Sequence, residues 1–169
     1  MIRICFHGAE STGKSTLAAA LAEELGCPLV AEYGRIHAET VGTDFTMADL
    51  LEIGREQDRR IRAVSADDPP LVLLDTDPLM TAAWAQMLFG EIPPELLAYG
   101  KAELYLLFAP DVPWQFDGTR FFGLHEARAD FAAIAERLLV ETGVRYQTIS
   151  GFWGEREATV RAAIDAALG

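Results

Sequence analysis

The chain has 169 residues and a formal net charge of -12, and 50% of its residues are hydrophobic. This charge argues against a nucleic-acid partner, which would need a basic face. The hydrophobic content excludes a disordered chain. The length suggests one domain over residues 1–169. No apolar run reaches the ~18 residues of a membrane span, so we expect no membrane partner.

The predicted elements alternate between strands and helices. Apolar runs bounded by turn residues predict strands over residues 2–7, 28–31, 71–75, 104–108 and 144–149. Helical patterns occupy residues 15–25, 47–64, 78–89, 126–141 and 154–168. This order predicts an α/β fold with a five-stranded, mostly parallel sheet and helices on both faces. Ligands bind such sheets at the carboxyl ends of the strands, so we expect the chemistry just after each strand.

The loop after the first strand carries the most specific motif of the chain. Its sequence Gly-Ala-Glu-Ser-Thr-Gly-Lys-Ser fits the P-loop pattern, whose backbone N–H groups wrap a polyphosphate beside a helix N-terminus. We expect Lys14 to reach the β- and γ-phosphates and Ser15 to hold Mg²⁺. The motif predicts a P-loop NTPase fold that binds ATP. The predicted ATP contacts are Gly8, Glu10, Ser11, Thr12, Gly13, Lys14, Ser15 and Thr16.

Carboxylates follow the third and the second predicted strands. Asp75 ends the third strand in a Walker-B pattern, so we expect it to bind Mg²⁺ or act in catalysis rather than only cap the next helix. Asp77 directly precedes Pro78 and is the better helix cap, and a substrate-binding or catalytic role for it is equally open. Glu32 follows the second strand and could accept the proton of an acceptor hydroxyl. The alternative for Glu32 is a surface glutamate paired with Arg35.

Basic and aromatic side chains complete the set at the strand ends. Arg35 could bind phosphate or substrate oxygens, and Tyr33 is expected to pack or stack. Trp114 follows the fourth strand and could either stack on a flat ring or plug its own loop. Arg120 and Arg128 lie in a segment that could fold over the phosphates. Arg120 is the better candidate for stabilising the transferred phosphoryl group, because a glycine and a threonine precede it and allow movement.

Three further features are less decisive. Gln57 could read a base or amide edge, but an ordinary solvated helix face is favoured. Residues 150–153 are a reasonable place for adenine contacts. Cys5 and Cys27 are far apart in sequence, so we expect them to pack as small apolar groups in a reducing cytoplasm. The three histidines show no metal-ligand spacing.

Four motifs together resemble those of the NadR-type ribosylnicotinamide kinase domains. They are the P-loop, Glu-Tyr-Gly-Arg at 32–35, Asp-Thr-Asp at 75–77 and Pro-Trp-x-x-Asp-Gly-x-Arg at 113–120. The resemblance covers almost the whole chain. It implies an ATP- and Mg²⁺-dependent kinase that phosphorylates the 5′-hydroxyl of nicotinamide riboside to give nicotinamide mononucleotide.

The resemblance also implies roles for residues on the acceptor side. Trp114 would stack on the nicotinamide ring, Asp75 would lie beside the riboside, and Arg120 would belong to a lid. The implied substrate contacts are Glu32, Tyr33, Arg35, Asp77, Trp114 and Asp117. The candidate catalytic residues are Lys14, Glu32, Asp75 and Arg120.

Two alternatives to this reaction stay open. One is a kinase for another nucleoside or nucleotide, and the other is a regulatory ATPase or nucleotide switch. Against a guanine switch, the sequence has no Asn-Lys-x-Asp segment. Bifunctional members of the family place an adenylyltransferase domain before the kinase. Because this sequence begins at the first strand, we expect no signal peptide and expect another protein to form the dinucleotide.

Overall fold

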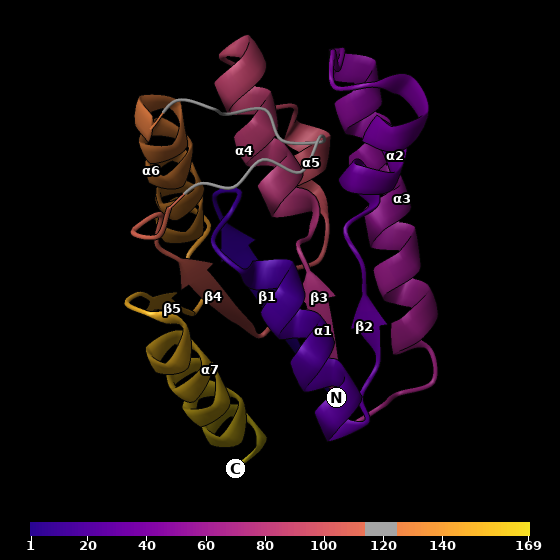
Figure 1. The fold of residues 1–169 in the computed structure, drawn as a ribbon. Coiled ribbons are helices and arrows are strands. Elements are labelled where there is room, and N and C mark those ends of the chain that lie inside the picture. The colour runs from indigo at the N-terminus through magenta and orange to yellow at the C-terminus, as the bar shows by residue number, and fades with distance from the viewer. Residues whose placement is uncertain (114–124) are drawn as a thin grey trace.

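The fold is a parallel sheet covered by helices on both faces, as the computed structural model shows for residues 1–113 and 125–169 (Figure 1). Within these residues the sheet has five strands in the order β2-β3-β1-β4-β5, and all of the pairings are parallel. The predicted α/β class is therefore confirmed. The strands are β1 (Ile2–Gly8), β2 (Leu29–Val30), β3 (Leu71–Asp75), β4 (Leu104–Phe108) and β5 (Tyr146–Ile149).

A hydrophobic cluster lies on each face of the sheet. Successive residues of a strand point to opposite faces, and Ile4 and Phe6 of β1 enter one cluster while Cys5 enters the other. The first cluster lies under α1 (Lys14–Leu25) and α7 (Trp153–Leu168). Cys27 packs against this first cluster. The second cluster lies under the remaining described helices. Those helices are α2 (Tyr33–Val41), α3 (Met47–Ser65), α4 (Pro78–Phe89), α5 (Pro94–Ala98) and α6 (His125–Glu141).

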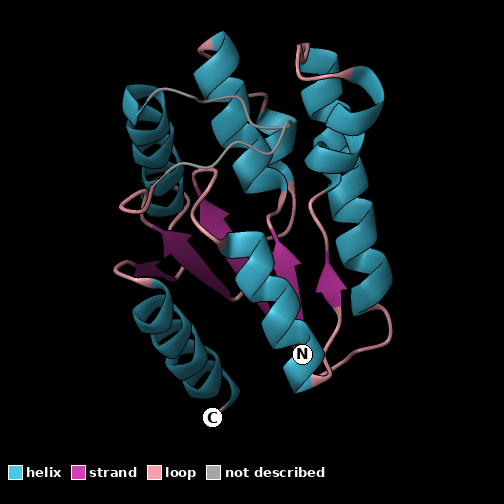
Figure 2. Ribbon diagram, in the orientation of Figure 1, coloured by secondary structure: helices cyan, strands magenta, loops and turns pink. Residues whose placement is uncertain are grey.

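The central position of β1 brings three strand ends to one edge. Phe6 pairs with Asp75 of β3, and Gly8 pairs with Phe108 of β4. Figure 2 shows the strand arrows running in one direction, so the loops that follow them meet at the same edge. A Cβ on Gly8 would lie 2.5 Å from the carbonyl oxygen of Phe108, and φ of Gly8 is 120°. Glycine is therefore required where β1 leaves the sheet.

Local sequence explains where two of the helices begin. Thr46 and Asp49 form a capping box at the start of α3, in which the Asp49 amide donates to the Thr46 hydroxyl. Asp77 caps α4, and Pro78 occupies its first turn, where a missing N–H costs nothing. None of the described helices combines the length and apolar character that a membrane span requires.

The structure differs from the sequence-based expectation mainly around β2. This edge strand has two residues, Leu29 and Val30, and pairs only with β3 among the described strands. The chain then enters α2 at Tyr33 instead of continuing as a loop. Neither α2 nor the five-residue α5 was predicted, because α2 contains Gly34 and α5 is too short for a helical period.

Candidate functional site

The loop between β1 and α1 has the shape of an anion cradle. Ser11 and Gly13 both adopt left-handed backbone conformations, with φ of 56° and 86°. A Cβ on Gly13 would lie 2.8 Å from Cζ3 of Trp153, so a side chain here would displace that ring as well as strain the backbone. Alternation of such conformations makes successive N–H groups converge, and the start of α1 adds positive potential. The predicted phosphate loop therefore has the backbone that polyphosphate binding needs.

Lys14 is held against its own loop. Its Nζ donates to the carbonyl oxygen of Ala9 at 2.7 Å, and the Thr12 hydroxyl donates to the same oxygen at 2.9 Å. Burial lowers the pKa of Lys14, while the charges of Glu32 and Asp75 act in the opposite direction. The ammonium group thus lies in the electrostatic field of both carboxylates.

Asp75 supplies a buried oxygen that is free to bind a ligand. Asp75 is the last residue of β3 and is 6% exposed. Its Oδ1 has no hydrogen-bond partner among the described residues. An unpaired buried carboxylate oxygen is costly unless it meets a cation or a donor. Ser15 adds a partly buried hydroxyl in the first turn of α1. Oxygen donors of this kind suit Mg²⁺, so the residues present fit the ion that the P-loop implies.

Glu32 is the residue before α2, in the N-cap position. Burial and the charge of Asp75 raise its pKa to about 7, while Lys14 and Arg35 lower it. The guanidinium of Arg35 lies 4.0 Å from the Glu32 carboxylate, and both side chains are partly exposed. The structure therefore brings Lys14, Glu32, Arg35 and Asp75 into one electrostatic cluster at the predicted edge.

Gln57 is a structural link that sequence reasoning missed. It is 1% exposed, so the interpretation as a solvated helix face is wrong. Its Oε1 accepts from the Tyr33 amide at 2.8 Å, and its Nε2 donates to the carbonyl oxygens of Thr76 and Ala31 at 3.3 and 3.4 Å. The side chain thereby fastens the start of α2 to the end of β3. Its helical spacing from Leu50, within the buried stripe of α3, was the available signal.

Asp77 and Tyr33 are engaged within the protein. Asp77 is 1% exposed. Its carboxylate accepts hydrogen bonds from the Leu79 amide at 3.1 Å and from the Tyr105 hydroxyl at 2.5 Å. The predicted helix cap is thus confirmed. Burial raises the pKa of Asp77. The Tyr33 ring lies under the guanidinium of Arg60, 4.6 Å from ring centroid to Cζ, and packs against the second cluster.

The described residues do not cover the whole predicted site. Trp114, Asp117 and Arg120 lie outside them. Arg128 is described, and the structure places it in α6, where it is 2% exposed. Its Nε donates to the carbonyl oxygen of Glu10 at 3.1 Å, so this buried side chain contacts the phosphate loop from the interior of the protein.

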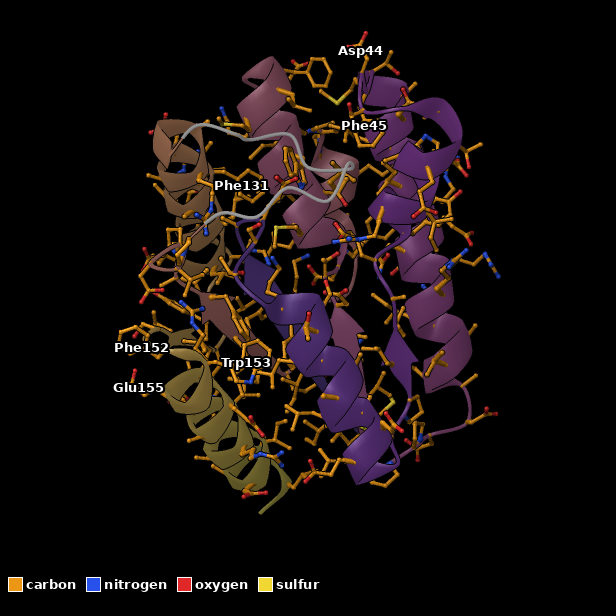
Figure 3. The ribbon with its side chains drawn as sticks, in the orientation of Figure 1. Asp44, Phe45, Phe131, Phe152, Trp153 and Glu155 are labelled. Atoms are coloured by element: carbon orange, nitrogen blue, oxygen red, sulfur yellow. The ribbon has the colours of Figure 1, made fainter. Side chains whose placement is uncertain are left out.

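A pocket of about 280 Å³ adjoins the phosphate loop. Its walls are residues 11–13, Thr16, Val112, Pro113, Trp153 and Arg156. Figure 3 shows Trp153 on the side of α7 that faces α1, whereas Phe152 lies on the outer side. Trp153 is 47% exposed and can present a flat face to a ligand. The pocket includes one residue of the 150–153 loop suggested for adenine contacts.

Comparison with known proteins agrees with this architecture. Residues 3–156 match the family described as AAA domain. The trifunctional NAD biosynthesis/regulator protein NadR of Escherichia coli K12 is 26% identical over 152 residues, which are 85% of this chain and 37% of that protein. The crystal structure of NadR protein in complex with NR superposes with a TM-score of 0.79 at 22% identity, covering 98% of this chain and 51% of that one.

A further solved structure has the same fold at very low identity. Deoxyadenosine kinase from M. mycoides gives a TM-score of 0.71 at 8% identity, covering 98% of this chain and 100% of that one. The present chain therefore spans about half of the NadR chain and the whole of this smaller one. With most of its length matched, the chain belongs to the AAA domain family and is related to the NadR ribosylnicotinamide kinase domain.

Proposed function

We propose that the protein is an ATP-dependent kinase that phosphorylates a nucleoside, with nicotinamide riboside as the preferred acceptor. The observation that carries this proposal is the meeting of two kinds of group at one sheet edge. The phosphate loop with Lys14 lies on one side, and the partly buried Glu32 and the unpaired oxygen of Asp75 lie on the other. A carboxylate with a raised pKa beside the phosphate loop is suited to accepting the proton of an acceptor hydroxyl, which a protein that only binds nucleotide does not require.

The donor half would bind ATP through the backbone of residues 8–16 and the Lys14 ammonium. Lys14 would leave the Ala9 carbonyl for the β- and γ-phosphate oxygens. Ser15 and Asp75 would hold Mg²⁺, which neutralises charge on the phosphates when it is bound. The pocket of about 280 Å³ beside Trp153 would hold the base next to the loop. This arrangement leaves the γ-phosphate at the edge where β3 ends.

The acceptor half would work through Glu32 and Arg35. A carboxylate with a pKa of about 7 is well matched to accept the proton of a hydroxyl near neutral pH. Arg35 would orient phosphate or acceptor oxygens through its fork of donors. Tyr33 would shape the wall at the start of α2, and Asp77 would act by fixing α4. Trp114, Asp117 and Arg120 take the roles that the family resemblance implies.

The preference for nicotinamide riboside is supported by the motif order and by relatedness to NadR, whose structure was solved with NR. The deoxyadenosine kinase structure contains other nucleotides, so another nucleoside is the alternative acceptor. The two possibilities share the donor half and differ only in what binds beside Glu32.

The test offers the purified protein ATP and Mg²⁺ with nicotinamide riboside and with purine and pyrimidine nucleosides. We expect riboside-dependent ADP release and a product whose mass is that of nicotinamide mononucleotide. ADP release that no nucleoside changes would contradict the kinase proposal. Phosphorylation of other nucleosides, but not of the riboside, would keep the mechanism and reject the preferred acceptor.

A further inference from the structure

Two arginines are the largest fully buried side chains among the described residues. Arg128 of α6 is 2% exposed, and Arg156 of α7 is 1% exposed. The proposed chemistry uses neither of them. Because a buried guanidinium is costly unless its donors are bonded, the groups that it contacts indicate its role.

Both arginines donate to carbonyl oxygens of the phosphate loop. Arg128 Nε donates to Glu10 at 3.1 Å, and its Nη2 donates to Ser11 at 3.4 Å. Arg156 Nη1 donates to Thr12 at 3.3 Å. Three successive carbonyl groups of the loop therefore face the two guanidinium groups.

Because the peptide bond is planar, these contacts also fix the direction of the N–H groups on the opposite side of the loop. In a trans peptide, the carbonyl of one residue and the N–H of the next point in opposite directions. The N–H groups of Ser11, Thr12 and Gly13 are thereby directed away from the arginines. Such convergent N–H groups are the donors that bind phosphate. The permanent charges of the arginines also add positive potential behind the loop.

The same side chains join the phosphate loop to the loops after β4 and β5. Arg128 Nη1 donates to the carbonyl oxygen of Val112 at 3.0 Å. Arg156 Nε donates to the carbonyl oxygen of Gly151 at 2.8 Å, and its Nη2 bonds the Asp111 carboxylate. Three loops from distant parts of the chain are thus held in one arrangement.

We propose that Arg128 and Arg156 are positioning residues that pre-shape the phosphate loop by holding the carbonyl groups of residues 10–12. This inference rests on the proposed binding of a triphosphate by that loop, and it does not depend on the acceptor. Pre-shaping removes the cost of ordering the loop when the ligand arrives. Loss of the guanidinium contacts therefore weakens binding of the phosphates rather than binding of the base.

The experiment compares Arg128→Lys and Arg156→Lys with Arg137→Lys and Arg161→Lys. The control arginines lie on the same two helices, with side chains 50% and 38% exposed. Lysine keeps the charge but loses the fork of five donors. Inorganic tripolyphosphate and adenosine serve as separate probes in titration calorimetry, at a temperature where melting curves show each variant to be folded.

We expect tripolyphosphate affinity to fall about tenfold, equivalent to ~1.4 kcal/mol, in both buried variants. The controls should bind it as the unchanged protein does. Adenosine affinity should fall less than tripolyphosphate affinity in Arg128→Lys, because Arg128 acts on the pocket beside Trp153 only through the backbone of its walls. A folded Arg128→Lys that loses affinity for both probes equally, or for neither, would overturn the inference.

A second variant covers the case in which Arg156→Lys does not fold. Asp111→Asn removes the carboxylate that anchors Arg156 but leaves the guanidinium in place. It should weaken tripolyphosphate binding by about threefold, and an unchanged affinity would overturn the role of Arg156. A wild-type protein that binds tripolyphosphate but phosphorylates no nucleoside would contradict only the kinase proposal. Absence of tripolyphosphate binding by the wild type would overturn the positioning role.

Discussion

On the β1–α1 side of the site, the groups that face the proposed ligand are mainly backbone N–H groups, whereas on the β2–α2 side they are side chains. The phosphate loop is shaped by left-handed residues and by contacts from two buried arginines. Glu32 and Arg35 instead project from the start of α2, which is fastened by Gln57. A triphosphate is the same in every kinase, so fixed backbone suits it. An acceptor differs between kinases, and side chains can change without altering the fold.

Loss of Lys14 would break the donor half. In Lys14→Ala, kcat should fall by roughly 10³-fold, because the transferred phosphoryl group loses the cationic side chain that stabilises its charge. Steady-state kinetics measure this effect, and circular dichroism should show an unchanged fold. Turnover within about twofold of wild type would contradict the assignment of the phosphate loop.

Removal of the Gln57 amide would damage the acceptor half selectively. Gln57→Leu leaves the Tyr33 amide without its acceptor, and the free energy of unfolding should fall by about 1–3 kcal/mol. The acceptor KM should rise more than the ATP KM, because α2 loses its link to β3. Gln57→Glu keeps an acceptor for the Tyr33 amide but loses both donors, so its buried carboxylate would face the carbonyl oxygens of Ala31 and Thr76, and we expect it to lose at least as much stability. Equal increases in the acceptor KM and the ATP KM would show that Gln57 does not act on the acceptor half alone.

Trp153 tests the other end of the donor half. Trp153→Ala should raise the ATP KM by about tenfold, the loss of roughly one stacked aromatic contact, and leave the acceptor KM unchanged. Phe152→Ala is the control, because Phe152 is 83% exposed and lies on the outer side of α7. Similar effects of the two substitutions would remove the reason for placing the base beside Trp153.

The smallest effect is expected at Glu32, in the pH profile. Its carboxylate is active when deprotonated and its pKa is raised to about 7, so kcat/KM should decline as the pH falls through 7. In Glu32→Gln this decline should disappear. At pH 8, kcat should drop by less than about tenfold, because a loose transition state needs little help from a base. A pH profile that is the same in both proteins would leave Glu32 with a binding role only.

The features that the sequence predicts correctly are those whose contacts lie close together in the chain. The P-loop motif places Gly8, Gly13 and Lys14 in one short segment between β1 and α1, and α4 begins at Pro78, directly after its predicted cap Asp77. Sequence reasoning failed for Gln57, whose partners Ala31 and Thr76 lie 26 and 19 positions away. It gave no role to Arg156, because the contact with Thr12 spans 144 positions. Side chains that join distant loops carry no local pattern.

The placement of β1 has a consequence for how the protein matures during synthesis. β1 is made first, yet its neighbours β3 and β4 end only at Asp75 and Phe108. The contacts of Arg128 and Arg156 with residues 10–12 form only after the chain has emerged past Arg156. The phosphate loop is therefore made before the segments that give it its final shape. Nucleotide that binds this shape selectively stabilises finished molecules over partly folded ones.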